Sequence, residues 1–140
     1  MRAAILFRIV PIIAALALAV PGQAKVANTA AVDGAVWENP YHSVKVRTGN
    51  CAGKLCGWVV WATPEAQKDA RDSGTDRLIG TQLLEDYTPY GPGKWRGHVF
   101  VPDMGHRFYS TISLLDPATL KVSGCVLGGL ICKSQIWHKD

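Results

Sequence analysis

The feature that most constrains the fold is a near-palindrome, CVLGGLIC, which runs from Cys125 to Cys132. Two glycines lie at its centre, and Gly-Gly readily adopts the positive φ angles of a two-residue hairpin turn. A turn centred on Gly128-Gly129 places Cys125 directly opposite Cys132. Residues opposed in this way lie about 4.5 to 5.5 Å apart between Cα atoms, within the range that a disulfide spans. The sequence therefore predicts a Cys125–Cys132 disulfide across the end of a β-hairpin.

A second stretch of the same kind is CAGKLC, from Cys51 to Cys56. A turn at Gly53-Lys54 sets Cys51 against Cys56, which predicts a second local disulfide worth about 2 kcal/mol. Four and six residues separate the paired cysteines, whereas thiol–disulfide enzymes usually have two between them, near a helix N-terminus. We therefore expect structural disulfides. We expect no metal and no cofactor, because no Cys/His spacing matches a common zinc pattern.

The N-terminal segment has the order of a secretory signal peptide. Arg2 and Arg8 lie near the start, an apolar run covers residues 9–20, and Gly22 and Ala24 occupy the small-residue positions before a cleavage site. The alternative is a membrane-spanning helix, which needs about 20 apolar residues; this run is shorter and contains a proline. We predict residues 1–24 to be a signal peptide cleaved near Ala24, a periplasmic or secreted location, where disulfides persist, and no stable membrane insertion.

The mature chain suits one domain. Removing 24 of the 140 residues leaves 116, over residues 25–140, enough for a single core. Cleavage also removes two of the 15 basic residues, so the formal net charge falls from +4 to +2. The remaining lysines and arginines are scattered, whereas nucleic-acid binding needs a basic patch. We therefore expect no nucleic-acid partner.

Most of the mature sequence reads as short strands joined by turns. Residues 43–51 alternate polar and apolar side chains, which is typical of a half-buried strand. The Gly53-Lys54 turn pairs Val46 of this strand with Trp61 of the next, on the apolar face. One short surface helix is predicted to follow, with Thr63 as its N-cap and Pro64 at the first helical position.

A further hairpin is predicted around Pro102-Asp103-Met104-Gly105, which has the composition of a tight turn. It pairs Val101 with His106 and makes His98 and Tyr109 neighbours on the outer face. General acid–base catalysis requires such groups to converge in a cleft, and exposed strand faces carry them routinely. We therefore predict that the protein is not an enzyme and has no catalytic residues.

The last strand is predicted near residues 131–139, and its register conflicts with its composition. Continuing the pairing of the preceding hairpin points Lys133 inward, beside Gln135 and Trp137. A lysine side chain is rarely buried without a partner. We therefore expect a bulge, or the end of a barrel, at this position.

Six to eight short antiparallel strands with five tryptophans predict an all-β fold, a small barrel or a sandwich. An eight-stranded barrel has an interior that side chains just fill or that holds one small ligand. The residues that the registers turn inward are the candidates for binding a ligand: Val46, Val59, Trp61, Trp95, Val99, Phe108 and Ile112.

The order of several short motifs resembles that of a bacterial family of small secreted proteins catalogued as domain of unknown function 2147. The motifs are Leu55-Cys56-Gly57, Arg77-Leu78-Ile79-Gly80, Trp95-Arg96-Gly97, Pro102-Asp103-Met104-Gly105, Leu120-Lys121-Val122-Ser123-Gly124 and Ser134-Gln135-Ile136-Trp137. The segment Thr63–Asp76 and the residue Val101 depart from the family pattern. The resemblance implies a lipocalin-like, or calycin-like, antiparallel barrel of about eight strands, and it implies no established activity.

Two functions follow from these expectations. We predict that the protein binds a small apolar or amphipathic ligand inside the barrel. The alternative is a filled core, with a non-enzymatic interaction or structural role in the cell envelope. The apolar tip of the Cys125–Cys132 hairpin motivates this alternative, although we expect the tip to tuck over the barrel end. The residues that would otherwise contact a protein partner are Val126, Leu127, Leu130 and Ile131.

Overall fold

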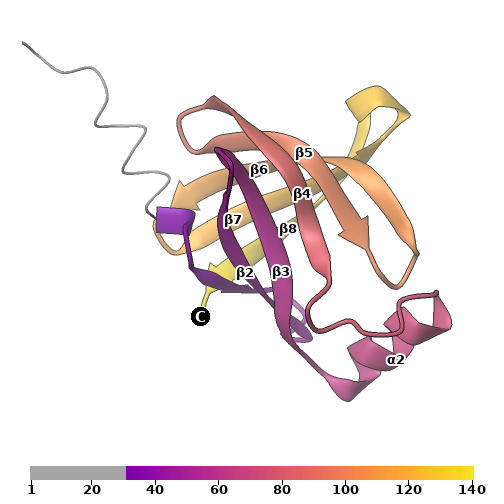
Figure 1. Cartoon of the computed structure of the whole chain (residues 1–140). Helices are drawn as coiled ribbons and strands as arrows, with labels where there is room; N and C mark the ends of the chain where they lie inside the picture. Colours follow the sequence, from indigo (N-terminus) through magenta and orange to yellow (C-terminus); the bar gives the residue numbers. More distant parts are fainter. Residues whose placement is uncertain (1–30) are drawn as a thin grey trace, which may run out of the picture.

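Eight antiparallel strands close into a barrel in the computed structural model, which describes residues 31–140 (Figure 1). Each strand pairs with its neighbour in sequence, and the short first strand also pairs with the last, which closes the barrel. The all-β prediction is confirmed, while the predicted signal peptide lies outside the described residues. The strands are β1 (Val36–Glu38), β2 (Val44–Cys51), β3 (Lys54–Ala62), β4 (Gln82–Gly91), β5 (Lys94–Val101), β6 (His106–Asp116), β7 (Thr119–Val126) and β8 (Ile131–Lys139).

The predicted helix is α2 (Pro64–Asp72), which follows β3 at one end of the barrel (Figure 1). The Thr63 side chain accepts a hydrogen bond from the Ala66 amide at 3.1 Å, so the predicted N-cap is confirmed. Ala70 is buried, and the Ser73 hydroxyl donates to the Asp103 carbonyl at 2.6 Å. The last bond ties the end of α2 to the turn between β5 and β6.

The β7–β8 hairpin has the predicted centre and the predicted disulfide. Cys125 pairs directly with Cys132, and the two sulfurs are bonded. Gly128 and Gly129 have φ angles of 66° and 93°, as the two-residue turn requires. Together with Leu127 they form the short 3₁₀ segment η1 (Leu127–Gly129), and Leu130 connects this segment to β8. The predicted pairing of Val101 with His106 between β5 and β6 is also confirmed.

The β2–β3 hairpin has the predicted disulfide but not the predicted turn. Ala52 and Gly53 are its central residues, with φ angles of 53° and 84°, and the Cys51–Cys56 bridge runs diagonally with a Cα–Cα distance of 6.0 Å. The Asn50 carboxamide oxygen accepts a hydrogen bond from the Gly53 amide at 2.8 Å, which holds the turn one residue earlier than predicted. The prediction of a Gly53-Lys54 turn was wrong because it ignored this side chain.

The inward placement of Trp61 was also wrong. Val46 pairs with Val59 and Lys45 pairs with Trp61, so Val60 is an extra residue in a bulge. The bulge turns Trp61 to the outer surface, where it is 43% exposed and the Lys45 ammonium lies 5.5 Å from its ring. One inserted residue changes the face of every side chain beyond it, because side chains alternate along a strand.

The expected bulge near Lys133 is absent from the described structure. β8 pairs residue by residue with β7, and Lys133 lies directly opposite Gly124. The alternative expectation, that this position lies at a barrel end, is the one confirmed, since Lys133 is exposed beside an open end. Its charge therefore remains in water, and the register needs no interruption.

The opposite end of the barrel is closed by a chain of buried polar contacts. The Trp37 indole donates to the Thr48 hydroxyl at 2.9 Å, and that hydroxyl donates in turn to the Val32 carbonyl. All three residues are almost completely buried. The segment before β1 therefore caps this end, and the Cys51–Cys56 hairpin lies beside it.

Candidate functional site

A cavity of about 900 Å³ occupies the open end of the barrel. It lies among the ends of β5 and β7, the starts of β2, β4, β6 and β8, and the inner side of α2. Binding sites for small molecules typically measure about 300 to 1,000 Å³. The volume therefore suits one organic ligand of moderate size. Much of the wall is apolar: Val44, Leu83, Val99, Val101, Phe108 and Val122.

The other half of the barrel is filled by side chains. Val46, Val59, Trp95 and Ile112 are buried there and take no part in the cavity wall. Among the seven predicted inward residues, only Val99 and Phe108 line the cavity. The sequence pattern identified which residues point inward, except for Trp61, but not the depth at which the packing ends.

A row of small residues crosses the wall between the two halves. Gly97 pairs with Ser110, and Ser110 pairs with Gly124 on the next strand. The Tyr87 ring fills the space over Gly97, where an added Cβ would lie 2.9 Å from its Cγ. The space over Gly124 is unfilled, because an added Cβ there would meet only Val99, at 3.7 Å. The missing side chain of Gly97 thus makes room for the Tyr87 ring, and the missing side chain of Gly124 enlarges the cavity.

Two hydroxyl groups are buried beneath the cavity without hydrogen-bond partners among the described residues. They belong to Tyr87 and Ser110. Burial raises the pKa of the Tyr87 phenol. The phenol therefore stays neutral far above neutral pH, and this layer of the barrel carries no charge.

Apart from its carboxylates, the cavity wall has two main groups of polar side chains. Asn39 and Thr63 are occupied by the fold: the Asn39 oxygen accepts from the Ser43 amide at 2.9 Å, and Thr63 caps α2. Lys133 and Gln135 form the second group, on the inner face of β8. Within residues 31–140 Lys133 makes no salt bridge, so its ammonium is available to a ligand.

Three carboxylates also line the cavity, on the side away from β8. Glu65 and Asp69 belong to α2, and Asp103 belongs to the β5–β6 turn. In a ring of eight strands, β8 lies four positions from β4, which α2 precedes, and the hydrogen bond from Ser73 to the Asp103 carbonyl places the β5–β6 turn beside the end of α2. The mouth is therefore polarised, with acidic groups on one wall and a single lysine on the opposite wall.

Exposed apolar side chains surround the mouth. Tyr41 is 73% exposed and Met104 is 57% exposed, and both line the cavity. At the hairpin tip Leu127 is 68% exposed and Leu130 is 85% exposed, while Val126 and Ile131 are exposed and line the cavity. The expectation that the tip tucks over the barrel end was wrong. Its turn bends toward the outer face, where a Cβ on Gly129 would lie 3.6 Å from the Tyr109 ring.

The groups considered for catalysis do not converge. His98 pairs with Tyr109 as predicted, but both side chains lie on the exposed outer face of the barrel. Within residues 31–140 no group of three or more His, Cys, Asp or Glu side chains is placed to hold a metal ion. The arrangement of the cavity instead offers an apolar volume with few charges at its entrance.

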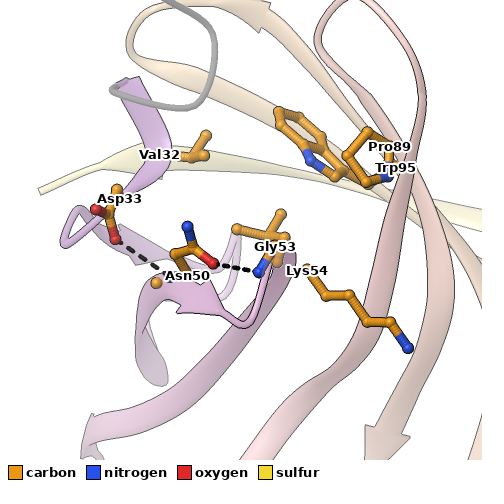
Figure 2. Close-up of a pocket in the computed structure, with 9 residues that line it drawn as sticks. Val32, Asp33, Asn50, Gly53, Lys54, Pro89 and Trp95 are labelled. Atoms are coloured by element: carbon orange, nitrogen blue, oxygen red, sulfur yellow. Dashed lines mark hydrogen bonds between the residues drawn. The ribbon is translucent and has the colours of Figure 1, made fainter. Parts of the chain in front are cut away.

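At the closed end, the described residues form a small depression of about 30 Å³, shown in Figure 2. Asp33 accepts a hydrogen bond from the Asn50 amide at 3.2 Å beside it, and Trp95 and Pro89 form its far wall. This volume is about that of one water molecule in the liquid. A small organic ligand therefore fits the open end of the barrel but not this depression.

The closed eight-stranded barrel with one open, hollow end is the architecture of a lipocalin-like protein. A solved structure with the same fold belongs to a protein from the human pathogen Helicobacter pylori, which is described as a member of the lipocalin family. The two structures superpose with a TM-score of 0.61 at 13% sequence identity, over 76% of this chain and 82% of the other. At this identity the likeness concerns the fold alone.

The chain belongs to the family described as "Uncharacterized protein conserved in bacteria (DUF2147)", whose sequence pattern matches residues 35–139. The resemblance inferred from the motifs is therefore confirmed over nearly the whole barrel. No curated protein matches the sequence. No helix within residues 31–140 combines the length and the apolar character that a membrane crossing requires.

Proposed function

We propose that this protein binds a small amphipathic ligand in the open half of its barrel and that it does so without catalysing a reaction. The observation that carries the proposal is the cavity of about 900 Å³ with its largely apolar wall. An apolar volume of this size would bury most of a small ligand, and the polar groups at the entrance would orient it. The lipocalin-like fold adds general support, since barrels of eight strands are wide enough to hold one small ligand.

We also propose that the protein works in the periplasm or outside the cell. Two disulfides join the four cysteines, and no cysteine in the described residues is free. Disulfides of this structural kind persist in oxidising compartments and are rare in the cytosol. In such a compartment a carrier would protect an apolar molecule from water between two membranes or outside the cell.

The size of the cavity can be tested with a series of straight-chain alcohols. Each methylene group buried on binding contributes about 0.8 kcal/mol, which corresponds to about a fourfold gain in affinity. Affinity for octanol, decanol, dodecanol and tetradecanol should rise by about this factor per methylene until the cavity is full, and then level off. Displacement of the neutral fluorophore N-phenylnaphthylamine from the purified protein would measure each affinity.

A variant that fills the cavity locates the binding site. Gly124→Leu places a side chain in the open space beside Val99, whereas Lys121→Leu adds apolar surface on the outer face of the same strand. We expect N-phenylnaphthylamine fluorescence to be lost in Gly124→Leu and kept in Lys121→Leu. Equal fluorescence in both variants would place the fluorophore outside the barrel and refute the proposal.

A second function, contact with a partner protein, is favoured by the exposure of the β7–β8 tip. Leu127 and Leu130 are the most exposed aliphatic residues of that hairpin, and a disulfide holds its base. An apolar tip on a rigid hairpin suits a transient interface beside the cavity entrance. This contact would complement ligand binding by directing where the ligand is collected or released.

A further inference from the structure

We propose that Lys133 and Gln135 form an anion-binding pair on the inner face of β8, and that the ligand therefore carries an oxyanion headgroup on an apolar body. This inference rests on the proposed function, because it names the chemistry of the ligand in the same cavity. Both residues line the cavity, two positions apart on one strand. Residues two apart on a strand point to the same side, so both side chains are directed to the same ligand.

The Gln135 carboxamide is oriented by its neighbour. The Trp137 indole donates a hydrogen bond to the Gln135 Oε1 atom at 2.9 Å. An indole N–H is a donor only, so the atom that accepts it must be the amide oxygen. The amide NH₂ group is consequently directed away from Trp137, and it has no hydrogen-bond partner among the described residues. It is a second fixed donor beside the Lys133 ammonium.

The neighbour of Lys133 on β7 leaves room for a headgroup. Gly124 lies directly opposite Lys133 and lines the cavity. Its backbone does not require glycine, because its φ angle is not among the positive ones and an added Cβ would make only ordinary contact. The absent side chain therefore keeps a space beside the ammonium that a carboxylate or phosphate group would occupy.

The charges across the mouth agree with this orientation. The cavity-lining carboxylates lie on α2 and the β5–β6 turn, on the side away from β8. They would repel an anionic headgroup from their own wall and leave β8 as the favourable position. Ile131 and Trp137 flank the two donors on the same inner face, so the pair is bordered by apolar surface on both sides along the strand.

The test compares headgroups on one alkyl chain. Dodecanoate, dodecyl phosphate, dodecanol and dodecyltrimethylammonium, each below its micellar concentration, would compete for N-phenylnaphthylamine at neutral pH. We expect at least one of the two anions to bind roughly tenfold more tightly than dodecanol, as a charge-assisted hydrogen bond at a partly solvated site provides. The ratio between dodecanoate and dodecyl phosphate then distinguishes a carboxylate from a phosphate ligand.

Three variants assign the effect to residues. Lys133→Met keeps the length of the side chain and should remove the preference for anions, while Lys133→Arg should retain most of it. Gln135→Glu keeps an oxygen for the Trp137 indole but replaces the donor with a negative charge, so it should weaken anion binding and leave dodecanol unchanged. Lys121→Met, on the outer face of β7, is the matched control and should behave as the wild type.

The two proposals fail in distinguishable ways. If dodecanol binds and neither anion is preferred, or if the preference survives in Lys133→Met, the anion-binding pair is refuted while the apolar cavity stands. If none of the four compounds displaces the fluorophore and the fluorophore itself does not bind, the proposed function is refuted, and the anion-binding pair with it.

Discussion

Three glycines differ in the space that surrounds them, because two lie in the filled half of the barrel and one lies beside the cavity. Replacing each with alanine and measuring the free energy of unfolding tests whether that space is filled. At Gly97 an added Cβ would lie 2.6 Å from the Glu85 carbonyl oxygen and 2.8 Å from the Tyr87 Cα. At Gly57 it would lie 2.9 Å from the Leu84 Cδ1 and 3.0 Å from Val46. At Gly124 the nearest atom would be 3.7 Å away. None of these glycines has a positive φ, so the contrast is one of space alone.

The magnitudes follow from the atoms that must move. Overfilling a packed core costs about 1 to 3 kcal/mol. Gly97→Ala should lie at the upper end, about 3 kcal/mol, because its contacts are backbone atoms of β4 and the two strands must separate. Gly57→Ala should cost about 1 to 2 kcal/mol, since side chains can shift. Gly124→Ala should be neutral or stabilising by up to about 0.5 to 1 kcal/mol, because alanine reduces the conformational freedom of the unfolded chain.

Urea unfolding followed by tryptophan fluorescence would give these free energies, since five tryptophans report on the barrel. An unchanged slope with denaturant would show that only stability has changed. In a thermal scan, the Gly97→Ala loss corresponds to a fall in Tm of roughly 10 °C or more. Equal stability of the three variants would refute the reasoning, as would a loss at Gly124 larger than that at Gly97, because the cavity would then not extend over Gly124.

Three further predictions concern other parts of the molecule. Ala52→Asn should stabilise the protein by about 0.5 to 1 kcal/mol in urea unfolding, because Ala52 has a φ of 53° in a two-residue turn for which Asn-Gly is preferred; destabilisation would contradict the corrected turn position. The double variant Leu127→Ser with Leu130→Ser should change the unfolding free energy by less than about 0.5 kcal/mol, because both side chains are exposed, and a marked fall in Tm would mean that the tip packs on the barrel after all. Burial raises the pKa of Tyr87, so the folded protein holds this proton while the unfolded chain releases it near pH 10. The free energy of unfolding should therefore fall as the pH rises above about 10, and Tyr87→Phe should weaken this pH dependence. Absorbance at 295 nm should show that one of the four tyrosines ionises only when the protein unfolds. Ionisation of all four tyrosines together in the folded protein would contradict this prediction.

The sequence predicted those features that local chemistry determines. The Gly128-Gly129 turn, the Pro102–Gly105 turn and the Thr63 cap act within a few residues, and each formed where it was expected. The Cys125–Cys132 disulfide followed from the same local geometry, whereas the Cys51–Cys56 disulfide formed between the predicted residues but across a turn one residue earlier than predicted. Alternation of side chains along the strands then identified most of the buried interior, including the residues beneath the cavity.

The errors arose where a single residue outside the pattern considered sets the structure, either a side chain next to a turn or an extra residue within a strand. The Asn50 carboxamide moved the β2–β3 turn, and a single extra residue at Val60 turned Trp61 outward. No pattern in the sequence marks where side-chain packing ends within a barrel, so the depth of the cavity and the residues around its mouth, such as Tyr41 and Met104, were missed. Lys133 was the exception, because its inward register conflicted with its charge and that conflict pointed to the open end.

The central claim is that the open half of this barrel holds a small amphipathic molecule. Native mass spectrometry of the protein taken from the periplasm or medium of its own host, under gentle desolvation, tests it most directly. We predict a species heavier than the mature polypeptide with two disulfides, whose excess mass is released on denaturation and is reduced in Gly124→Leu. A wild-type protein that shows only the bare polypeptide mass, and that gives no N-phenylnaphthylamine fluorescence in solution, would contradict the claim.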